Sequence, residues 1–316
     1  MSADPTQFEE PIVRIRRRID ELTAMDAEPA RQTELADLQQ KLTKVSTEIY
    51  SKLTPWQKTL VARHPQRPYT LDYISALIED WSEVAGDRKF GNDPAVVAGF
   101  GRFRGINCCV VGHQKGRNTK EKVYRNFGQP RPEGFRKALR VMQLAEKFRL
   151  PILSFIDTQG AYPGMGAEER GQAEAIAVNL REMAALEVPV IVSVIGEGGS
   201  GGALALGVGD RVLMLEHAVY SVISPEGCAA ILWKNSSAAP DAAAAMKITA
   251  QDLKKFGIID EIVSEPPGGA HADPNAAAEL LADAIDRAVR DLQKLKPQQL
   301  LDERYRKFRR MGVFEQ

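Results

Sequence analysis

The chain has 316 residues and a formal net charge of zero, with 42 basic and 42 acidic side chains. This balance gives no overall field that would favour nucleic acid or an anionic membrane surface as a partner. A hydrophobic share of 44% and a charged share of 27% are typical of a globular protein. No apolar run approaches the ~20 residues that a membrane span requires.

The first residues have neither the basic nor the apolar region of a signal peptide, so we expect a cytoplasmic protein. The three cysteines, Cys108, Cys109 and Cys228, form neither a disulfide framework nor a metal-ligand spacing. We interpret them as buried, reduced thiols.

Two amphipathic helices are predicted near the N-terminus. Residues 11–26 place isoleucines and a leucine on one face, and residues after Pro29 repeat Leu, Val and Ile at heptad spacing up to Ile49. The pattern fits a helical hairpin or an arm that clasps a partner, and equally an ordinary helix pair on the domain's own core. Prolines around His64 mark a junction, which favours a structural role for that histidine. Helix is predicted again over 71–86.

From residue 94 the pattern changes to strands. Residues 95–103 and 106–111 flank Arg104-Gly105 and predict a β-hairpin. The polar stretch 112–122 contains Lys115 and Arg117, which could hold phosphates or a carboxylate, although a solvated loop is the default interpretation of such a charge run.

A strand, a glycine-rich turn and a helix then recur at intervals of roughly 40 residues, which predicts an α/β fold with loops at the carboxyl ends of the strands. Before the first repeat, an amphipathic helix over 132–149 should bury Phe135, Leu139, Met142 and Phe148. The repeats are strand 151–156 with helix 167–186, strand 188–195 with a short helical exit, and strands 211–216 and 218–223 with a helix through Trp233. Strand 258–263, a Pro/Gly linker, helix 275–295 and a basic tail complete the chain.

The second repeat is the most informative stretch. Its β-branched strand enters Gly196–Gly202, which holds five glycines, and a small-residue helical segment follows. Glycines permit positive φ and let a ligand approach main-chain N–H groups that no Cβ shields. Those N–H groups lie at a helix start, so the stretch predicts an oxyanion or phosphate site built from backbone.

Two other interpretations of this stretch compete with a site built from main-chain donors. Gly196–Gly201 matches the dinucleotide fingerprint, with Glu216 downstream. From Gly202, however, only about seven residues precede Gly209-Asp210 and the next strand, too few for a crossover helix. Gly198–Gly202 matches the nucleophile elbow around Ser200. A serine nucleophile needs a base, and the histidines that follow are badly placed: His217 is too close and His271 lies in a Pro/Gly linker, while His113 precedes the serine.

Several motifs together resemble the carboxyltransferase α subunit of bacterial multisubunit acetyl-CoA carboxylase, from about residue 8 to the last helix. They are Gly196-Glu-Gly-Gly-Ser-Gly-Gly-Ala-Leu-Ala205, Gly112-His-Gln-Lys-Gly-Arg117, Gly160-Ala-Tyr-Pro-Gly164 with Glu168-Glu-Arg-Gly171, and Ser221-Val-Ile-Ser-Pro-Glu-Gly-Cys228, with His64-Pro-Gln-Arg-Pro-Tyr-Thr-Leu-Asp72 and Gly268-Gly-Ala-His271. Gln159 departs from the family pattern, where a proline is expected, which leaves the rigidity of that loop open.

The resemblance implies an α/β, crotonase-like (ClpP-like) fold of stacked ββα units with helical N-terminal and C-terminal extensions. We expect an arm and junction at 1–88, a core at 89–265 and a helical segment at 266–316, with the family's carboxyltransferase domain spanning about 40–292. The resemblance also implies transfer of a carboxyl group from carboxybiotin to acetyl-CoA, giving malonyl-CoA for fatty-acid synthesis. The carboxybiotin would be carried on a biotin carboxyl carrier protein. The implied partners are a β subunit in an α2β2 assembly and biotin carboxylase, with zinc in the β subunit and no metal here.

The site residues are hypotheses carried by the same motifs. The N–H groups of Gly201 and Gly202 are expected to be catalytic, by stabilising charge on the biotin carbonyl. The expected biotin-binding residues are Gly198, Gly199, Ser200, Gly160, Ala161, Tyr162, Ser224, Pro225, Glu226 and Gly227. Lys115 and Arg117 are expected to bind an anion.

Two alternatives from other functional classes remain. An acyl-CoA hydratase or isomerase would share the fold but needs paired acid–base carboxylates, for which Glu197 and Glu226 are the loop candidates. A non-catalytic assembly subunit would keep the helical arms and tolerate loss of the glycines.

Overall fold

A mixed sheet of eight strands forms the centre of the computed structural model, which describes residues 7–24 and 29–312. The strand order is β1-β2-β3-β4-β5-β6-β8, and β7 pairs with β5. The first three strands are antiparallel, and every pairing from β3 onward is parallel. The strands are β1 (Ile78–Glu83), β2 (Val96–Phe103), β3 (Ile106–His113), β4 (Ile152–Thr158), β5 (Val190–Gly199), β6 (Arg211–Leu215), β7 (Val219–Ser221) and β8 (Glu261–Val263).

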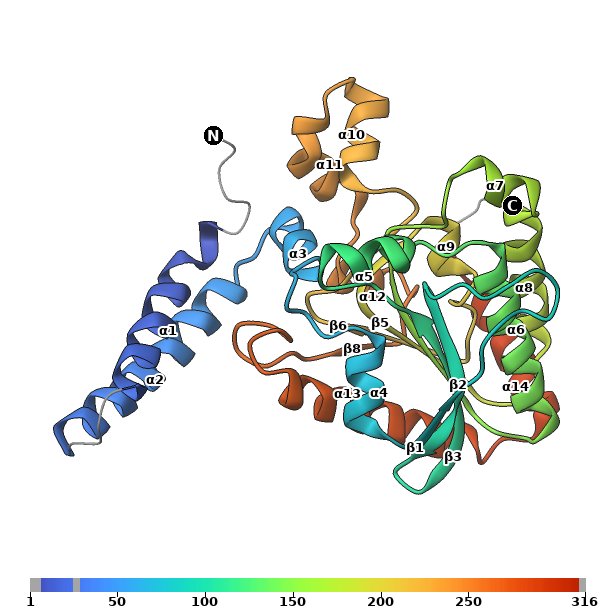
Figure 1. The fold of residues 1–316 in the computed structure, drawn as a ribbon, viewed down its shortest axis with the longest axis horizontal. Helices are drawn as coiled ribbons and strands as arrows, with labels where there is room; N and C mark the ends of the chain where they lie inside the picture. The colour runs from blue at the N-terminus through green and yellow to red at the C-terminus, as the bar shows by residue number, and fades with distance from the viewer. Residues whose placement is uncertain (1–6, 25–28, 313–316) are drawn as a thin grey trace.

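Helices cover both faces of this sheet (Figure 1). Helices α6 (Pro132–Lys147) and α8 (Gln172–Ala185) pack on one face, and α4 (Thr70–Leu77) and α13 (Pro274–Leu292) on the other. Short helices lie in the segments that connect these elements. They are α3 (Pro55–Ala62), α5 (Thr119–Tyr124), η2 (Asn126–Gly128), α7 (Met165–Glu169), α9 (Ser200–Leu204), α10 (Pro225–Trp233), η3 (Ser236–Ala238), α11 (Ala239–Met246) and α12 (Ala250–Lys255). The chain ends in α14 (Pro297–Arg309).

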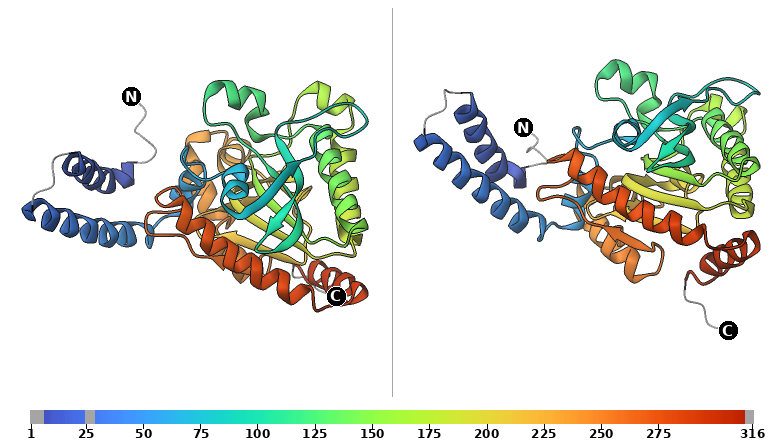
Figure 2. Two further views of the ribbon diagram at one scale, coloured as in Figure 1. Left: turned by 60° about the horizontal axis from the view of Figure 1, so that its bottom comes forward. Right: turned by 90° about the horizontal axis from the view of Figure 1, so that it is seen from below.

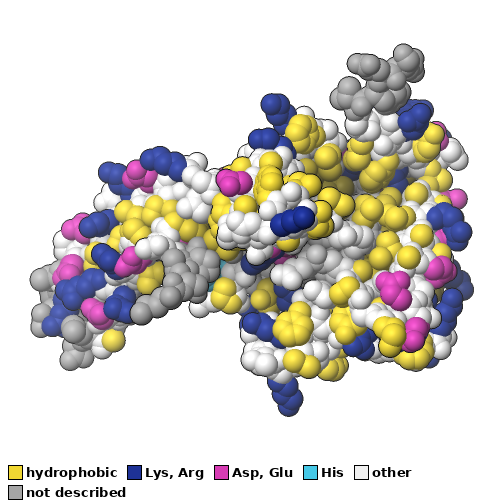
Figure 3. All heavy atoms as spheres, turned by 90° about the horizontal axis from the view of Figure 1, so that it is seen from above, with side chains coloured by type: hydrophobic (Ala, Val, Ile, Leu, Met, Phe, Trp, Pro, Cys, Tyr) yellow, Lys and Arg dark blue, Asp and Glu magenta, His cyan; other side chains and the backbone are white. Residues whose placement is uncertain are grey.

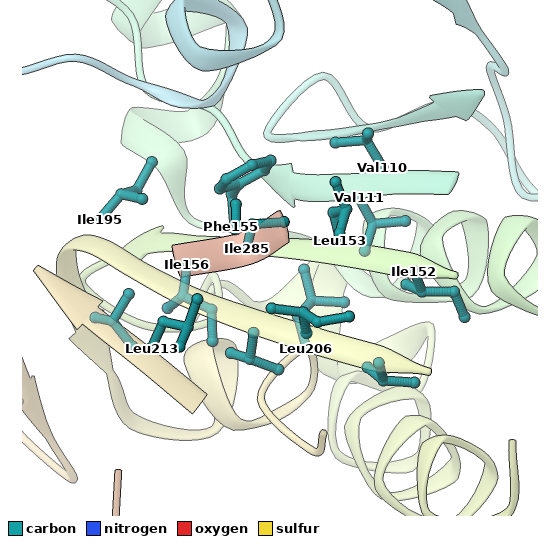
Figure 4. Packing of buried hydrophobic residues seen from close by; sticks show 14 of the residues in the cluster. Val110, Val111, Ile152, Leu153, Phe155, Ile156, Ile195, Leu206, Leu213 and Ile285 are labelled. Carbon is teal, nitrogen blue, oxygen red and sulfur yellow. The ribbon is translucent and has the colours of Figure 1, made fainter. Parts of the chain in front are cut away.

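The core lies between the sheet and these helices. Strands β4 and β5 are buried along their whole length, as parallel strands covered on both faces must be. Figure 4 shows Ile152, Leu153 and Ile156 of β4 packed close to side chains from the neighbouring strands and to Ile285 of α13. The rigid centre of the sheet therefore carries the loops that follow β4 and β5.

An αα-hairpin projects from the body at the N-terminus (Figures 1 and 2). It consists of η1 (Gln7–Glu9), α1 (Glu10–Thr23) and α2 (Pro29–Tyr50), and its heptad residues are half-buried between the two helices. A small cluster around Ile12, Tyr50 and Val61 connects it to the body. The predicted hairpin is confirmed, whereas the alternative of a helix pair lying on the main core is wrong.

Four predicted elements differ from the structure. The helix expected over 71–86 ends at Leu77, and its second half is the edge strand β1, so the sheet begins before residue 89. The long helix expected over 167–186 is interrupted at Gly171, whose φ of 81° breaks the turn between α7 and α8. Phe148 follows the end of α6 and is 62% exposed instead of inward. The basic tail is the helix α14, and its Arg304 is buried.

No helix in the described residues 7–24 and 29–312 is both long and apolar enough to cross a membrane. Of the cysteines, Cys108 and Cys109 are buried and Cys228 is half-buried, and all three are free thiols.

Candidate functional site

A cavity of about 740 Å³ lies at the carboxyl ends of β4 and β5. Its walls come from the loop after β4, the first turns of α8 and α9, and the loop that leads into α10. The lining residues are Arg63, Gln129, Gln159, Gly160, Ala161, Tyr162, Pro163, Glu168, Gln172, Ala173, Ile176, Ser200, Gly201, Val222, Ile223, Ser224 and Glu226. The loops that follow β4, β5 and β7 therefore converge on one cavity.

The glycine-rich loop between β5 and α9 uses its glycines for close packing. None of the glycines in 196–202 has positive φ, which corrects the sequence expectation, and the left-handed residue is Ser200, with φ of 53°. A Cβ on Gly199 would lie 2.2 Å from the carbonyl oxygen of Gln159, and one on Gly202 would lie 2.5 Å from the nitrogen of Ala161. The loops after β4 and β5 can touch because these residues have no side chain.

Gly201 and Gly202 hold different positions in this loop. Gly201 lines the cavity, and a Cβ there would lie 3.4 Å from Cδ1 of Ile176, an ordinary contact. Gly202 is buried behind it. Both belong to the first turn of α9, whose N–H groups have no acceptor within the helix.

His113 lies beneath the loop and is fully buried. Its Nε2 is 3.1 Å from the carbonyl oxygen of Gly202, and its Nδ1 is 3.4 Å from the main-chain N–H of Asp157. This pairing requires Nδ1 to accept and Nε2 to donate, so the ring is neutral. Burial lowers the pKa of His113 to about 4, which agrees with that assignment. With both nitrogens engaged by backbone, His113 offers Ser200 no base.

Arg63 at the end of α3 joins the two carboxylates that the sequence offered as an acid–base pair. Its Nε and one terminal nitrogen donate to the two oxygens of Glu197 at 2.9 and 2.6 Å. The other terminal nitrogen donates to Glu226 at 2.5 Å. Partial burial would raise the pKa of Glu226, but the hydrogen bond and charge of Arg63 outweigh burial and lower it. Both carboxylates are therefore held as ion-pair partners.

Tyr162 is held in the cavity wall by its neighbours. The amide of Gln172 donates to the carbonyl oxygens of Tyr162 and Pro130 at 2.9 and 2.8 Å. The guanidinium of Arg131 lies 4.8 Å from the centre of the Tyr162 ring. The loop after β4 thus has a defined conformation without the proline expected at Gln159.

The structure brings seven of the predicted site residues to the cavity wall: Gly160, Ala161, Tyr162, Ser200, Gly201, Ser224 and Glu226. Gly198, Gly199, Gly202, Pro225 and Gly227 lie in the same loops and shape it from behind. Sequence reasoning missed Arg63, Gln129, Gln172 and Ile176, because these residues lie outside the glycine-rich motifs that predicted the site.

The two residues expected to bind an anion lie away from the cavity wall. Lys115 is 14% exposed and is paired with Asp157 at 2.6 Å, under the loops. Arg117 lines a different cavity, where it pairs with Asp72 and lies over the ring of Tyr69. The charge run 112–122 is thus partly an internal structural element, instead of the solvated loop taken as the default.

A second cluster joins the N-terminal hairpin to the body. The ligand atoms of Glu9, His64 and His271 lie within 4.8 Å of one another, which is the one such group in the described part of the chain. The two imidazole rings are stacked, with centroids 3.9 Å apart and an angle of 26°. Lone pairs of nearly parallel rings cannot converge on one ion at a Zn–N distance of ~2.1 Å. The Tyr50 hydroxyl bonds Glu9 instead, so the cluster holds the hairpin in place.

Comparison with known proteins adds independent information. A family described as "Acetyl co-enzyme A carboxylase carboxyltransferase-like" matches residues 5–312. The acetyl-coenzyme A carboxylase carboxyl transferase subunit alpha of Bordetella pertussis is 57% identical over 98% of this chain and 97% of its own length. The proteins of the same name in Syntrophotalea carbinolica (57%, 98% of each chain) and Thioalkalivibrio sulfidiphilus (54%, 100% of each chain) are similar too.

Solved structures of lower identity show the fold. A Pseudomonas malonate decarboxylase hetero-tetramer chain has a TM-score of 0.58 at 16% identity, over 74% of this chain and 91% of that one. The P. aeruginosa geranyl-CoA carboxylase beta subunit has a TM-score of 0.55 at 18% identity, over 78% and 46%. Transcarboxylase 12S has a TM-score of 0.54 at 21% identity, over 69% and 42%. The expected crotonase-like fold is confirmed.

Proposed function

The chain belongs to the acetyl-CoA carboxylase carboxyltransferase-like family and is a carboxyltransferase α subunit, and from this premise we propose how its cavity takes part in carboxyl transfer. Carboxybiotin supplies the activated carboxyl group, and its ring carbonyl oxygen gains negative charge as that group is released. The chain's own task is to hold this ring and to stabilise the charge.

The cavity has the size and chemistry for a bicyclic ureido ring. Its volume of about 740 Å³ lies within the range of small-ligand sites. The side chain of Ile176 and the ring of Tyr162 supply apolar contact, and Gly201 exposes main chain at the wall. Gly160, with φ of 152°, keeps the opposite loop free of a side chain.

The observation that carries the proposal is the main chain at the start of α9. Gly201 lines the cavity in the first turn of α9, and Gly202 follows it in the same turn. N–H donors aimed at a developing oxyanion are worth ~10²–10³ in rate. His113 fixes the peptide that follows Gly202 through its carbonyl oxygen. We infer that Gly201 and Gly202 are the catalytic residues, and that the biotin-binding residues are the cavity loops around Gly160–Tyr162, Gly198–Ser200 and Ser224–Gly227.

The hydratase or isomerase alternative has less support. That chemistry needs a carboxyl group free to exchange protons with substrate. Glu197 and Glu226 are both paired with Arg63, and Glu197 is only 4% exposed at its side chain. A biotin ring held in the cavity would supply a proton acceptor of its own, so the main-chain scheme needs no protein base.

The partners proposed here follow from the α-subunit assignment. A β subunit would complete the site in an α2β2 assembly, hold the acetyl-CoA enolate with an equivalent glycine pair and carry zinc. The biotin carboxyl carrier protein and biotin carboxylase would supply carboxybiotin, with malonyl-CoA as the product and the cytoplasm as the location. Exposed apolar side chains support a protein partner: Met165 of α7, Val222 of the cavity wall, and Ile231 and Leu232 of α10 are each at least 66% exposed. Figure 3 shows many hydrophobic side chains on the face seen from above.

The test combines the purified chain with the β subunit, carboxybiotin and labelled acetyl-CoA, and measures labelled malonyl-CoA. Gly201→Val should lower the rate at least ~10²-fold, because the branched side chain fills the wall where the oxyanion would lie. Ser200→Gly is the matched control: it removes the hydroxyl at a φ of 53° that glycine adopts without strain, and should keep most of the rate. Loss of activity in Ser200→Gly would favour a serine nucleophile. Full activity of a folded, β-bound Gly201→Val protein would refute the main-chain scheme.

A further inference from the structure

Arg63 is the one basic side chain among the described residues that line the cavity. A cavity that receives a carboxylated ring must accommodate a negative charge, and the two basic residues expected for this role point elsewhere. Lys115 is sealed against Asp157, and Arg117 faces another cavity. The guanidinium of Arg63 is therefore the available cationic group.

The two carboxylates bound to Arg63 are not equivalent. Glu197 accepts two hydrogen bonds in the bidentate geometry, is 4% exposed at its side chain, and is tied by its own N–H to Asp157 at 3.0 Å. Glu226 accepts one bond at 2.5 Å and a second at 3.4 Å, and its side chain is 37% exposed. Glu197 is thus the more firmly held partner, whereas Glu226 is the one that solvent reaches.

The charges around Arg63 favour an exchange of Glu226 for an incoming anion. With one guanidinium and two carboxylates the triad carries a net charge of −1, which repels an incoming anion. Release of Glu226 restores neutrality and frees the N–H groups that it occupied, and a planar guanidinium binds a carboxylate in the same fork geometry. Glu226 lies in the first turn of α10, next to Ser224, Ile223 and Val222 of the cavity wall, so its release is confined to one edge of the site.

We propose that Arg63 binds the carboxylate of the incoming carboxylated ring, and that Glu226 is a resident carboxylate which this anion displaces. The inference rests on the proposed function, because it names the anchor for the carboxyl group within the same cavity. It assigns the anion-binding role to Arg63 in place of Lys115 and Arg117.

The test measures binding to the assembled α–β complex by calorimetry, with two stable probes. One is biotin methyl ester carrying a carboxymethyl group on the ring nitrogen, and the other is the neutral N-methyl analogue. Glu226→Gln should tighten binding of the anionic probe about fivefold, because the competing charge is gone, and should leave the neutral probe unchanged. Arg63→Lys should weaken the anionic probe about tenfold, because an ammonium cannot form the fork that holds Glu197 and the ligand together.

Coupling between Arg63 and Glu226 distinguishes the displacement of Glu226 from a general change in the charge of the cavity. In the Arg63→Lys background, Glu226→Gln should bring little of its fivefold gain. Glu168→Gln is the matched control, since Glu168 also lines the cavity but has no bond to Arg63. It should change the affinity of the anionic probe less than twofold. Thermal melting of each complex checks that the variants are folded.

Three results would overturn the inference. They are an unchanged or weaker affinity of Glu226→Gln for the anionic probe, a gain that persists fully in the Arg63→Lys background, and an equal gain from Glu168→Gln. Failure of the proposed function itself looks different, because the unmodified complex would then bind neither probe and would form no labelled malonyl-CoA.

Discussion

Substitution of Gly202 by alanine should damage both stability and activity, although alanine is the smallest possible side chain. The added Cβ would lie 2.5 Å from the nitrogen of Ala161 and from the carbonyl carbon of Gly160, where an ordinary contact is 3.4 Å or more. Those atoms are main chain and cannot rotate away, so one of the two loops must move by about 1 Å. Overpacking of this kind costs about 1–3 kcal/mol.

The same movement should lower the rate of carboxyl transfer. A displacement of about 1 Å in a catalytic geometry costs on the order of 10²-fold, and here it would move the glycine N–H groups relative to the wall formed by residues 160–162. Gly201→Ala is the matched control, because its Cβ would make only a 3.4 Å contact with Cδ1 of Ile176. Alanine also favours helix over glycine by about 1 kcal/mol, so this variant should be at least as stable as the natural chain.

The assays are urea-induced unfolding of the α subunit and malonyl-CoA formation by the complex with the β subunit. We expect Gly202→Ala to show a lower unfolding midpoint and a rate reduced by about 10²-fold. Gly201→Ala should keep its midpoint. Equal stability and equal activity of the two alanine variants would refute the argument that Gly202 is required for the close approach of the loops.

Two further predictions concern buried ion pairs. Arg304 donates to both oxygens of Asp210 and to four main-chain carbonyls. Arg304→Met should therefore lower the free energy of unfolding by about 3–5 kcal/mol in urea titrations, while the control Arg306→Met should change it by less than about 0.5 kcal/mol. Equal effects of the two substitutions would contradict this. Burial would raise the pKa of Glu265, but Arg67 outweighs it and lowers the pKa to about 2 from 4.5. A depressed carboxyl pKa stabilises the fold fully above pH 4.5, so stability should fall by about 3 kcal/mol as the pH drops from 4.5 to 2. Glu265→Gln should flatten the titration in that window, and an unchanged slope would disprove the assignment.

Local sequence patterns predicted much of the fold. The hairpin around Arg104-Gly105, the buried strand of β5 and the amphipathic α6 could be predicted because side-chain periodicity and turn residues act over a few positions. The same reasoning failed where tertiary context decides. Residues 78–83 pair with β2 as an edge strand, because the exposed edge of the hairpin offers main-chain partners that the sequence of this segment does not reveal.

The candidate site divides in the same way. The glycine-rich loop, the absence of a well-placed base in the chain order and the family of the chain could all be predicted from the amino-acid sequence, since each depends on contiguous residues. Tertiary structure alone decided that Ser200 is the left-handed residue and that the glycines serve close packing. It alone brought Arg63 to Glu197 and Glu226, which are 134 and 163 residues away along the chain. The partner of a charged side chain depends on how distant elements pack, and no local pattern encodes that choice.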